Sequence, residues 1–500
     1  MDVSSLSTGL ISASPGPLYR RLAEGLHDAV RRGEVGAGSR LPAERVLARS
    51  LGVSRTTVVG AYRLLREEGL LESGRGSGTR VVASGRWVGP EVPAATLPSA
   101  KLPDEPPPGV LDLSGSVVAG LDGLPRLEPV APDLRELAAA PAYRPLGLPS
   151  LREQIAARYT RLGLPTTADE VLVTSGAQQA LHLLFTLFGR NGGPVVTEDP
   201  GYAGALDAAR AAGASVLALP TDAEGIRVRP LRETLDRYPV SMLYLMTTCQ
   251  NPTGAVMSAE RRAEVARLAE RVGVTVVDDT TLAELVFEGR WHPLPNAASG
   301  VVVGSLSKLF WPGLRIGWLR APARLMTRLA RLKAVADLGS SEAGQLLAVR
   351  LLPATEDMAA ARRRQLTVRL DLLSTHLRSR LPSWSWTRPA GGPFLWARLP
   401  YGDGEAFAQL ALRYGVRVLP GARASVGRGF ADHLRISYVA GPEDLGAAVD
   451  RLAEAWAAFA PADDACPPGG AGGDLPRPGP RARARRQFRE NSARAQAPSP

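Results

Sequence analysis

This chain of 500 residues contains few cysteines, no long apolar run and no segment that resembles a signal peptide. Each of these features excludes a class of protein. The two cysteines, Cys249 and Cys466, lie far apart in unlike contexts, which indicates neither a disulfide framework nor a zinc site. No apolar run is long enough to span a membrane, and the first residues lack the basic start and apolar stretch of a signal peptide. With 45% hydrophobic residues, the composition predicts two or three globular domains located in the cytoplasm, without a membrane partner.

Lysine is also rare. Only Lys101, Lys308 and Lys333 occur, although Lys and Arg together number 60. Arginine stays protonated, whereas a desolvated lysine can lose its proton near neutral pH and attack an aldehyde. A lysine kept in such an arginine-rich chain therefore indicates a chemical need that arginine does not meet.

The surroundings of Lys308 suit a phosphate group. An apolar segment at 300–304 leads into Ser305 and Ser307, whose hydroxyls can bind a phosphate. The guanidinium of Arg315, seven residues later, suits the same dianion. A surface lysine after a strand is the plain alternative, and this motif alone leaves both interpretations open.

The net charge of +11 is concentrated at the two ends of the chain. Residues 1–83 carry 12 Arg against 8 Asp plus Glu, and residues 461–500 carry 7 Arg against 4. Such an excess indicates an anionic partner, and nucleic acid is the usual one. Residues 461–500 contain almost no large apolar side chains, so we expect this tail to be disordered.

The first 83 residues carry the pattern of a helix-turn-helix. Apolar residues recur at helical spacing over 18–30, and a short second helix meets Gly52 in a tight turn. Ser54 can cap the third helix, which has an apolar face over 58–65. The N-terminal end of that helix, where recognition helices meet base edges and phosphates, carries Arg55, Thr56 and Thr57.

A glycine-rich, basic segment at 70–82 follows and predicts a β-hairpin, the wing of a winged helix. Its glycines allow a close approach of the backbone, so the wing can insert Arg75 into a minor groove. The alternative is a three-helix bundle whose hairpin contacts protein. The helix-turn-helix, the basic wing and the local charge excess together favour DNA binding.

Two motifs in this region resemble the GntR family of bacterial transcription regulators. They are Leu-Pro-Ala-Glu-Arg at 41–45 and Val-Ser-Arg-Thr-Thr-Val at 53–58. The resemblance implies contacts with double-stranded operator DNA by Arg45, Arg55, Thr56 and the wing around Gly76. Ala43 and Val59 depart from the family pattern, so no operator sequence can be carried over.

Beyond a Pro-rich stretch at 84–110, which predicts a semi-stiff linker, the pattern changes to α/β. Short apolar strands alternate with amphipathic helices as far as about residue 460, which predicts a three-layer domain with a largely parallel sheet. Ligands of such sheets bind beyond the carboxyl ends of the strands. The candidate strands are 171–174, 194–197, 215–219, 242–246, 274–278 and 300–304.

Polar or aromatic residues follow five of these strands. A small-residue turn at 175–178 opens a helix whose free N–H groups and dipole would hold a phosphate. The other four strand ends lead to Tyr202, Asn251, Asp278 and Lys308. Each of these has a bland interpretation as a cap, turn or core residue. Their coincidence at one sheet edge favours a binding site.

Together these residues resemble the fold type I pyridoxal 5'-phosphate enzymes of the aminotransferase class, over about 110–460. The resemblance implies that Lys308 holds the cofactor as an aldimine, while Asp278 faces the pyridine nitrogen so that the ring acts as an electron sink. It also implies that Arg435 binds a carboxylate of the substrate or effector. The remaining residues implied around the cofactor are Gly176, Ala177, Gln178, Tyr202, Asn251, Thr280, Ser305, Ser307 and Arg315.

One departure concerns the phenolic oxygen of the cofactor. Relatives carry a tyrosine two or three residues after the aspartate, whereas this chain has Thr280 and Thr281. A threonine hydroxyl could replace the tyrosine weakly. This departure puts full transaminase chemistry in doubt.

The order of the two halves is that of the MocR subfamily of GntR regulators. We therefore expect a winged helix-turn-helix (1–83), a linker (84–110), an aminotransferase-like domain with a small C-terminal α+β subdomain (111–460) and a tail (461–500). The resemblance implies a regulator that senses pyridoxal 5'-phosphate, an amino compound or both, and that forms a head-to-tail homodimer. An active aminotransferase carrying a DNA-binding domain is one alternative. A purely structural α/β domain without cofactor is another.

Overall fold

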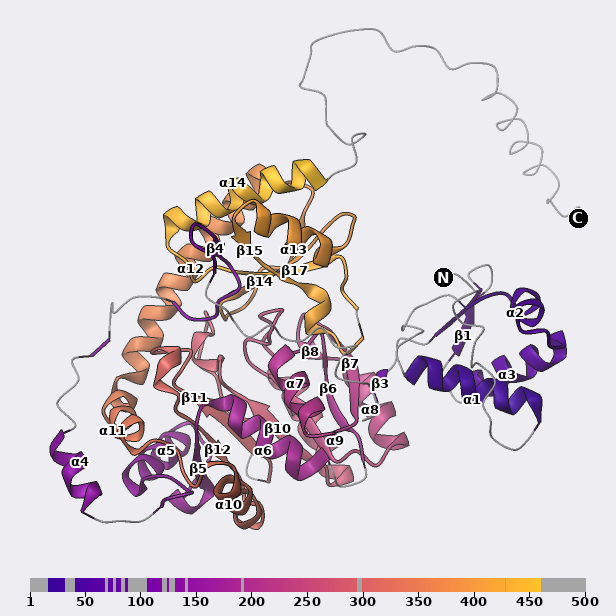
Figure 1. Ribbon diagram of the computed structural model, residues 1–500. Helices are drawn as coiled ribbons and strands as arrows, with labels where there is room; N and C mark the ends of the chain where they lie inside the picture. Colours follow the sequence, from indigo (N-terminus) through magenta and orange to yellow (C-terminus); the bar gives the residue numbers. More distant parts are fainter. Residues whose placement is uncertain are drawn as a thin grey trace, which may run out of the picture. The chain divides into compact units, whose positions relative to one another are not determined.

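A computed structural model of the chain describes most of the two predicted domains (Figure 1). None of the described helices is long and apolar enough to cross a membrane. The predicted tail and the wing residues Arg75 and Gly76 lie outside the described residues. The described ranges are 17–31, 41–67, 71–74, 78–81, 86–88, 106–118, 124–125, 131–139, 143–189, 193–294, 299–427 and 429–459.

The N-terminal part contains three helices and a hairpin, as predicted. The elements are α1 (Leu18–Arg31), α2 (Glu44–Leu51), α3 (Arg55–Glu67), β1 (Leu71–Gly74) and β2 (Gly78–Val81). Gly52 ends α2 with a φ of 65°, a left-handed conformation that suits glycine. The Ser54 hydroxyl accepts the Thr57 N–H at 3.1 Å, which confirms the predicted cap of α3. Leu22, Val58 and Tyr62 are among the residues of one buried core.

A mixed sheet of nine described strands forms the centre of the larger domain. Its hydrogen-bonded order is β3-β7-β6-β9-β10-β11-β12-β5, with β8 paired to β7. Strands β7, β6, β9, β10 and β11 run parallel, and β12 is antiparallel to both of its neighbours. The strands are β3 (Arg86–Val88), β5 (Val171–Thr174), β6 (Val195–Asp199), β7 (Val216–Asp222), β8 (Gly225–Ile226), β9 (Met242–Leu245), β10 (Thr275–Asp279), β11 (Val301–Ser305) and β12 (Gly317–Arg320).

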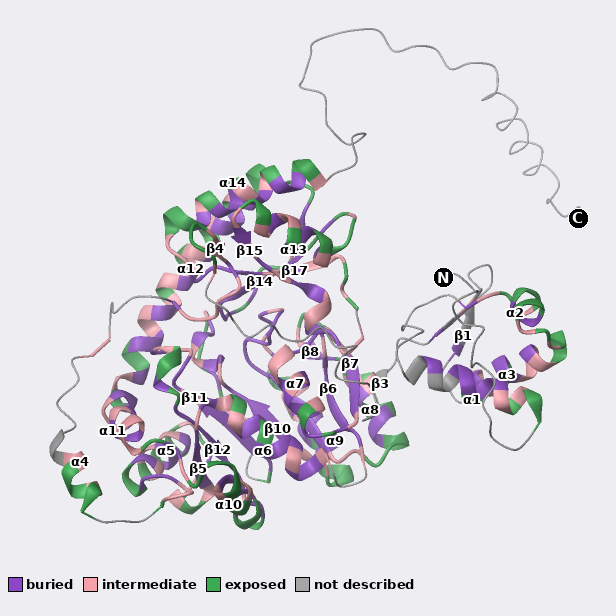
Figure 2. Cartoon of the chain, in the orientation of Figure 1, coloured by how far each residue is buried: buried purple, intermediate pink, exposed green. Residues whose placement is uncertain are grey.

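Helices cover this sheet, and α6 packs on β5, β11 and β12. The strands are buried and the outer helix faces are exposed (Figure 2). The described helices of the whole larger domain, including α13 and α14 of its C-terminal subdomain, are α4 (Ala131–Ala138), α5 (Pro149–Arg161), α6 (Ala177–Gly189), α7 (Ala203–Ala211), α8 (Val228–Arg237), α9 (Ala259–Val272), α10 (Ala323–Asp337), α11 (Glu342–Leu351), α12 (Thr355–Arg380), α13 (Gly404–Arg413) and α14 (Pro442–Phe459). Short 3-10 helices are η3 (Ala168–Glu170), η4 (Ala283–Leu285), η5 (Pro312–Leu314), η6 (Leu352–Ala354) and η7 (Gly421–Ala424).

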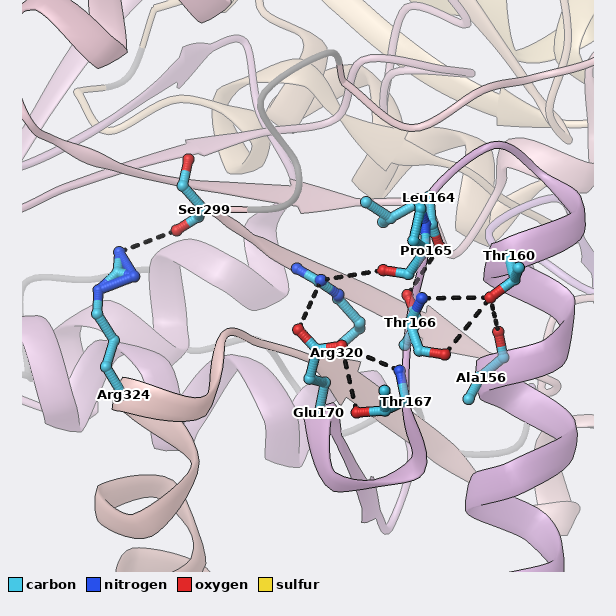
Figure 3. Close-up of polar contacts among 10 residues, drawn as sticks. All are labelled: Ala156, Thr160, Leu164, Pro165, Thr166, Thr167, Glu170, Ser299, Arg320 and Arg324. Carbon is cyan, nitrogen blue, oxygen red and sulfur yellow. Dashed lines mark hydrogen bonds and ion pairs between the residues drawn. The ribbon is translucent and has the colours of Figure 1, made fainter.

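All six predicted strands are present, and three further strands of the sheet, β3, β8 and β12, were not predicted. β3 lies within the predicted linker and pairs with β7 at the edge of the sheet. It was not predicted because three residues are too few to show a periodic pattern. β12 separates β5 from β11 and so fixes which loops become neighbours. Its last residue, Arg320, is 2% exposed and forms an ion pair with Glu170 of η3 at 2.8 Å (Figure 3). This pair attaches β12 to the start of β5.

The C-terminal subdomain is an antiparallel sheet covered by α13 and α14. The strand order is β13 (Ser385–Trp386), β14 (Phe394–Arg398), β17 (His433–Ser437) and β16 (Leu419–Pro420). A separate parallel pair joins β4 (Leu111–Asp112) to β15 (Val416–Arg417). The first strand after the predicted linker is therefore attached to the C-terminal subdomain, where Figure 1 shows β4 beside β15.

Candidate functional site

The two neighbouring aspartates at the end of β10 differ in their hydrogen bonding. Asp278 Oδ1 accepts the Thr247 hydroxyl at 2.9 Å, whereas its Oδ2 is buried without a hydrogen-bond partner among the described residues. Asp279 is satisfied on both oxygens, by Tyr244 Oη at 2.8 Å and the Thr281 N–H at 3.0 Å. Burial raises the pKa of Asp278 to about 6, and the nearby Arg262 charge opposes that rise. Asp278 is thus the carboxylate with an open acceptor.

Lys308 lies just beyond the end of β11, and its amine donates to the Ser116 hydroxyl. Burial lowers the pKa of this amine to about 8. The charges of Arg435 and Arg315 act in the same direction, and Asp279 opposes them. Lys308 therefore loses its proton at a lower pH than an ordinary lysine, which favours its use as a nucleophile.

The predicted phosphate turn at 175–177 faces Arg315 because β12 lies between β11 and β5. Arg315 Nη2 donates to the Ser175 carbonyl at 2.7 Å. A Cβ added to Gly176, whose φ is 81°, would lie 2.6 Å from Arg315 Nη2, and one added to Gly317 would lie 2.8 Å from the Ala177 nitrogen. Both glycines therefore allow an approach that a larger residue would prevent.

Ser305 and Ser307 follow β11 on the way to Lys308. The Ser305 hydroxyl accepts the Ser307 N–H at 3.1 Å and lies 3.4 Å from the Ile316 carbonyl. The Ser307 hydroxyl is buried and has no hydrogen-bond partner within the described ranges. A second unpartnered polar atom thus lies one residue from the lysine.

Tyr202 and Gln178 contact each other across two strand ends. Tyr202 Oη donates to Gln178 Oε1 at 3.1 Å, and Gln178 Nε2 donates to the Gly204 carbonyl at 2.6 Å. Burial raises the pKa of Tyr202, and Asp279 adds to the rise while Arg435 opposes it. Because both charges act on Tyr202, this residue after β6 lies close to Asp279 and Arg435.

Arg435 projects from β17 and is half-buried. Its Nη1 donates to Asn251 Oδ1 at 3.2 Å, and its Nη2 donates to the Ser114 carbonyl at 2.9 Å. The guanidinium lies 3.9 Å from the centre of the Phe394 ring. Burial lowers the pKa of Arg435 to about 10, which still leaves it charged at neutral pH.

The Thr280 hydroxyl, which the sequence offered as a weak replacement for the tyrosine of relatives, donates to the backbone. It donates to the Val303 carbonyl at 2.7 Å, and the Thr280 N–H donates to the same oxygen at 2.9 Å. The Thr280 hydroxyl therefore donates its proton to β11 and links the end of β10 to that strand. Thr281, whose side chain is half-buried, is the second hydroxyl at this turn.

Sequence reasoning missed Ser114, Ser116, Thr247 and Arg262. Arg262, which is half-buried, donates from Nη2 to the Thr247 carbonyl at 3.0 Å, so a positive charge lies next to the residue that orients Asp278. Ser114 and Ser116 are about 200 residues from Lys308 in the chain and belong to no motif that we identified. Their one recognisable feature in the sequence is a Ser-Gly-Ser stretch at 114–116, shortly after the predicted linker.

The predicted DNA-contacting residues of α2 and α3 lie on the surface. Arg45, Ser54 and Thr56 are exposed, and Thr57 is half-buried. The side chain of Arg55 is 55% exposed and pairs with Glu44 at 3.2 Å. Such an exposed pair contributes little to stability, so it leaves Arg55 available for another anion.

Comparison with known proteins covers both domains. Residues 113–454 match the family described as aminotransferase class I and II, and residues 18–81 match the gntR family of bacterial regulatory proteins. The HTH-type transcriptional regulator YdcR of Escherichia coli K12 is 31% identical over 452 residues, which cover 84% of this chain and 94% of that protein. The probable rhizopine catabolism regulatory protein MocR of Rhizobium meliloti is 30% identical over 338 residues, covering 62% and 66%.

Among solved structures, LysN from Thermus thermophilus is similar to the larger domain. It is an alpha-aminoadipate aminotransferase complexed with N-(5'-phosphopyridoxyl)-L-leucine. The similarity has a TM-score of 0.65 at 31% sequence identity and covers 70% of this chain and 93% of LysN. The larger domain therefore has the fold of class I and II aminotransferases.

Proposed function

Because this chain belongs to the MocR-type regulators, in which a GntR helix-turn-helix is fused to a class I and II aminotransferase domain, we propose that it is a ligand-sensing transcription regulator. Its aminotransferase-like domain binds pyridoxal 5'-phosphate and senses the cofactor, an amino compound or both. The observations that carry this proposal are the lowered pKa of Lys308, just beyond β11, and the open oxygen of Asp278 on the neighbouring parallel strand β10.

The residues of the site fit this cofactor. Asp278 Oδ2 is a buried acceptor that receives no donor from the part of the chain that the structure describes, which suits the protonated pyridine nitrogen. The unpartnered Ser307 hydroxyl, the guanidinium of Arg315 and the backbone at Gly176 suit the phosphate. Tyr202 supplies an aromatic ring beside them. When bound, the cofactor supplies an aldehyde and an electron-withdrawing ring.

Each of these residues has a defined task in the proposal. Lys308 presents an amine that loses its proton more readily than an ordinary lysine, because burial lowers its pKa to about 8. Asp278 holds a proton on the ring nitrogen, and Thr247 fixes the carboxylate in place. Asn251 orients Arg435, whose guanidinium receives the carboxylate of an amino compound.

The DNA-binding half supplies the output. The N-terminal end of α3 would enter the major groove with Arg55 and Thr56, while Arg45 of α2 contacts the phosphate backbone. A homodimer would bring two such domains onto two half-sites, and ligand binding would change their spacing by shifting a two-state equilibrium.

Arg55→Ala tests this half of the proposal. We expect the full chain to enrich a two-half-site duplex from a random library, and Arg55→Ala to bind that duplex about 10-fold to 100-fold more weakly because one base or phosphate contact is lost. Fluorescence anisotropy at fixed salt measures the affinity. Arg413→Ala, an exposed arginine on α13, is the matched control. Equal affinities of the wild type and Arg55→Ala for the duplex would remove α3 from the interface.

An active aminotransferase is the second candidate, and the presence of Asp278, Lys308 and Arg435 in one site favours it. The threonines at 280–281, where relatives have a tyrosine, disfavour it. Incubation of the cofactor-loaded chain with an amino donor and a keto acid separates the two candidates. Product that accumulates well beyond one equivalent per chain identifies an enzyme, and product limited to one equivalent identifies a sensor.

A further inference from the structure

Of the two lysines that the structure describes, Lys333 has no task in the proposed function. Its side chain, on α10, is 0% exposed, and its amine donates to Oδ1 and Oδ2 of Asp337, one turn later, at 2.5 Å and 2.7 Å. Burial lowers the pKa of this amine, because a buried charge has a desolvation cost. A well-packed apolar residue often stabilises such a position as well or better, so stability alone does not account for the lysine.

Asp337 connects Lys333 to the first turn of α6, on which α10 packs (Figure 1). Gln179 Nε2 donates to Asp337 Oδ2 at 2.8 Å, and Gln179 Oε1 accepts the Ser175 N–H at 2.8 Å. Burial alone would raise the pKa of Asp337, but the hydrogen bonds from Gln179 and Lys333 outweigh it and lower that pKa. A continuous set of hydrogen bonds thus joins the Lys333 amine to the backbone of the predicted phosphate turn at 175–177.

The turn after α10 makes a second contact with Ser175. The hydroxyl oxygen of Ser340 lies 3.2 Å from that of Ser175. Leu338 has a φ of 58°, a left-handed conformation that a leucine rarely adopts, and Asp337 Oδ1 stabilises this turn by accepting the Gly339 N–H at 3.0 Å. The side chains that connect α10 and its turn to Ser175, which we call the Lys333 network, are those of Lys333, Asp337, Gln179 and Ser340.

Ser175 is consequently held from two sides. Its carbonyl accepts Arg315 Nη2 at 2.7 Å, while its N–H and its hydroxyl contact the Lys333 network. Two residues later, Ala177 opens α6, and the free N–H groups of a first helical turn are the ones that bind a phosphate. A turn that is fixed before binding loses little conformational freedom on binding, so its rigidity adds to the affinity.

We propose that Lys333 is a positioning residue for the phosphate of the cofactor, and that it acts through Asp337 and Gln179 on the turn at 175–177. This inference rests on the proposed function. The Lys333 network supports only the groups that would bind the phosphate, whereas the aldehyde is the partner of Lys308 on another strand. Loss of Lys333 therefore weakens the binding of pyridoxal 5'-phosphate more than that of 5'-deoxypyridoxal, the same ring and aldehyde without the phosphate.

The ratio of these two affinities tests the inference. Lys333→Met removes the charge and keeps most of the side-chain volume, and Gln179→Met interrupts the network while Lys333 and Asp337 stay paired. Equilibrium titration of the full chain with each ligand, followed by absorbance, gives the dissociation constants. We expect each variant to reduce the preference for the phosphorylated ligand about five-fold or more, as the loss of one hydrogen bond implies, and to change the affinity for 5'-deoxypyridoxal by less than about two-fold.

Two further variants separate positioning from general destabilisation. Leu235→Ala, at a buried position of α8, should lower the free energy of unfolding and keep the wild-type preference. In the Gln179→Met background, Lys333→Met should cause a smaller further loss of preference than it causes alone, because the path through Gln179 is already interrupted. Gln179 is half-buried, so Gln179→Met keeps the inference testable if Lys333→Met does not fold.

Several results would overturn the inference. They are a wild type without preference for the phosphorylated ligand, a wild-type preference in Gln179→Met, equal losses of both affinities in Lys333→Met, and fully additive losses in the double variant. Mass measurement after borohydride treatment of the wild type separates the two levels. Absence of both ligands from Lys308 removes the proposed function, whereas cofactor on Lys308 with an unchanged preference in the variants removes only this inference.

Discussion

Replacement of Lys308 by alanine is expected to abolish covalent attachment of pyridoxal 5'-phosphate. In the wild type, borohydride treatment should fix one cofactor per chain, since Lys308 is half-buried and its pKa is lowered to about 8. The chain contains only three lysines, so a peptide map assigns the attachment without ambiguity. Lys101→Arg is the control and should keep full attachment. Equal labelling of Lys308→Ala and the wild type would show that the aldehyde reacts elsewhere.

The rate of attachment should also depend on pH in a defined direction. The neutral amine is the reactive form, so the rate should rise as the pH increases through about 8 and level off above it. An ordinary exposed lysine, with a pKa near 10.4, would show a rate that still rises at pH 9 to 10. Stopped-flow absorbance of the wild-type chain measures this profile. A midpoint near 10 would mean that Lys308 is not desolvated in solution.

Asp278→Asn is expected to weaken cofactor binding by about 10-fold to 100-fold. The substitution keeps the shape of the side chain but removes the negative charge that faces the ring nitrogen, and a charge-assisted hydrogen bond contributes about 1.5–3 kcal/mol. Equilibrium titration followed by absorbance gives the dissociation constant. The buried open oxygen of Asp278 is the structural basis of this expectation.

Asp279→Asn shows whether the loss of cofactor affinity is specific to Asp278. Both oxygens of Asp279 are already bonded, to Tyr244 and Thr281, so its substitution should lower the free energy of unfolding more than it lowers cofactor affinity. Urea unfolding of the two variants measures the first quantity. If Asp279→Asn loses more cofactor affinity than Asp278→Asn, the assignment of the two carboxylates must be reversed.

Much of the fold could be predicted because its local patterns are strong. The capping serine at position 54 and the left-handed Gly52 define the helix-turn-helix from short-range chemistry alone. In the larger domain, parallel strands put their carboxyl ends at one edge, so Asp278 and Lys308 could be expected near each other from sequence order.

Other features depend on contacts between residues far apart in the chain. The antiparallel strand β12 was missed, although it is what places Arg315 beside Gly176. The sequence pair at 278–279 does not reveal which carboxylate keeps a free oxygen, because that depends on donors from β9 and the turn after β10. The contact between Ser116 and Lys308 spans 192 residues and has no local pattern at all.

The coupling between ligand and DNA is tested most directly by operator affinity. Fluorescence anisotropy of the full chain on its selected duplex, at fixed salt, is measured without ligand, with pyridoxal 5'-phosphate, and with cofactor plus each amino acid. We expect an affinity change of about five-fold or more in the wild type and in Lys101→Arg, and none in Lys308→Ala. An identical ligand response in Lys308→Ala and the wild type would contradict it.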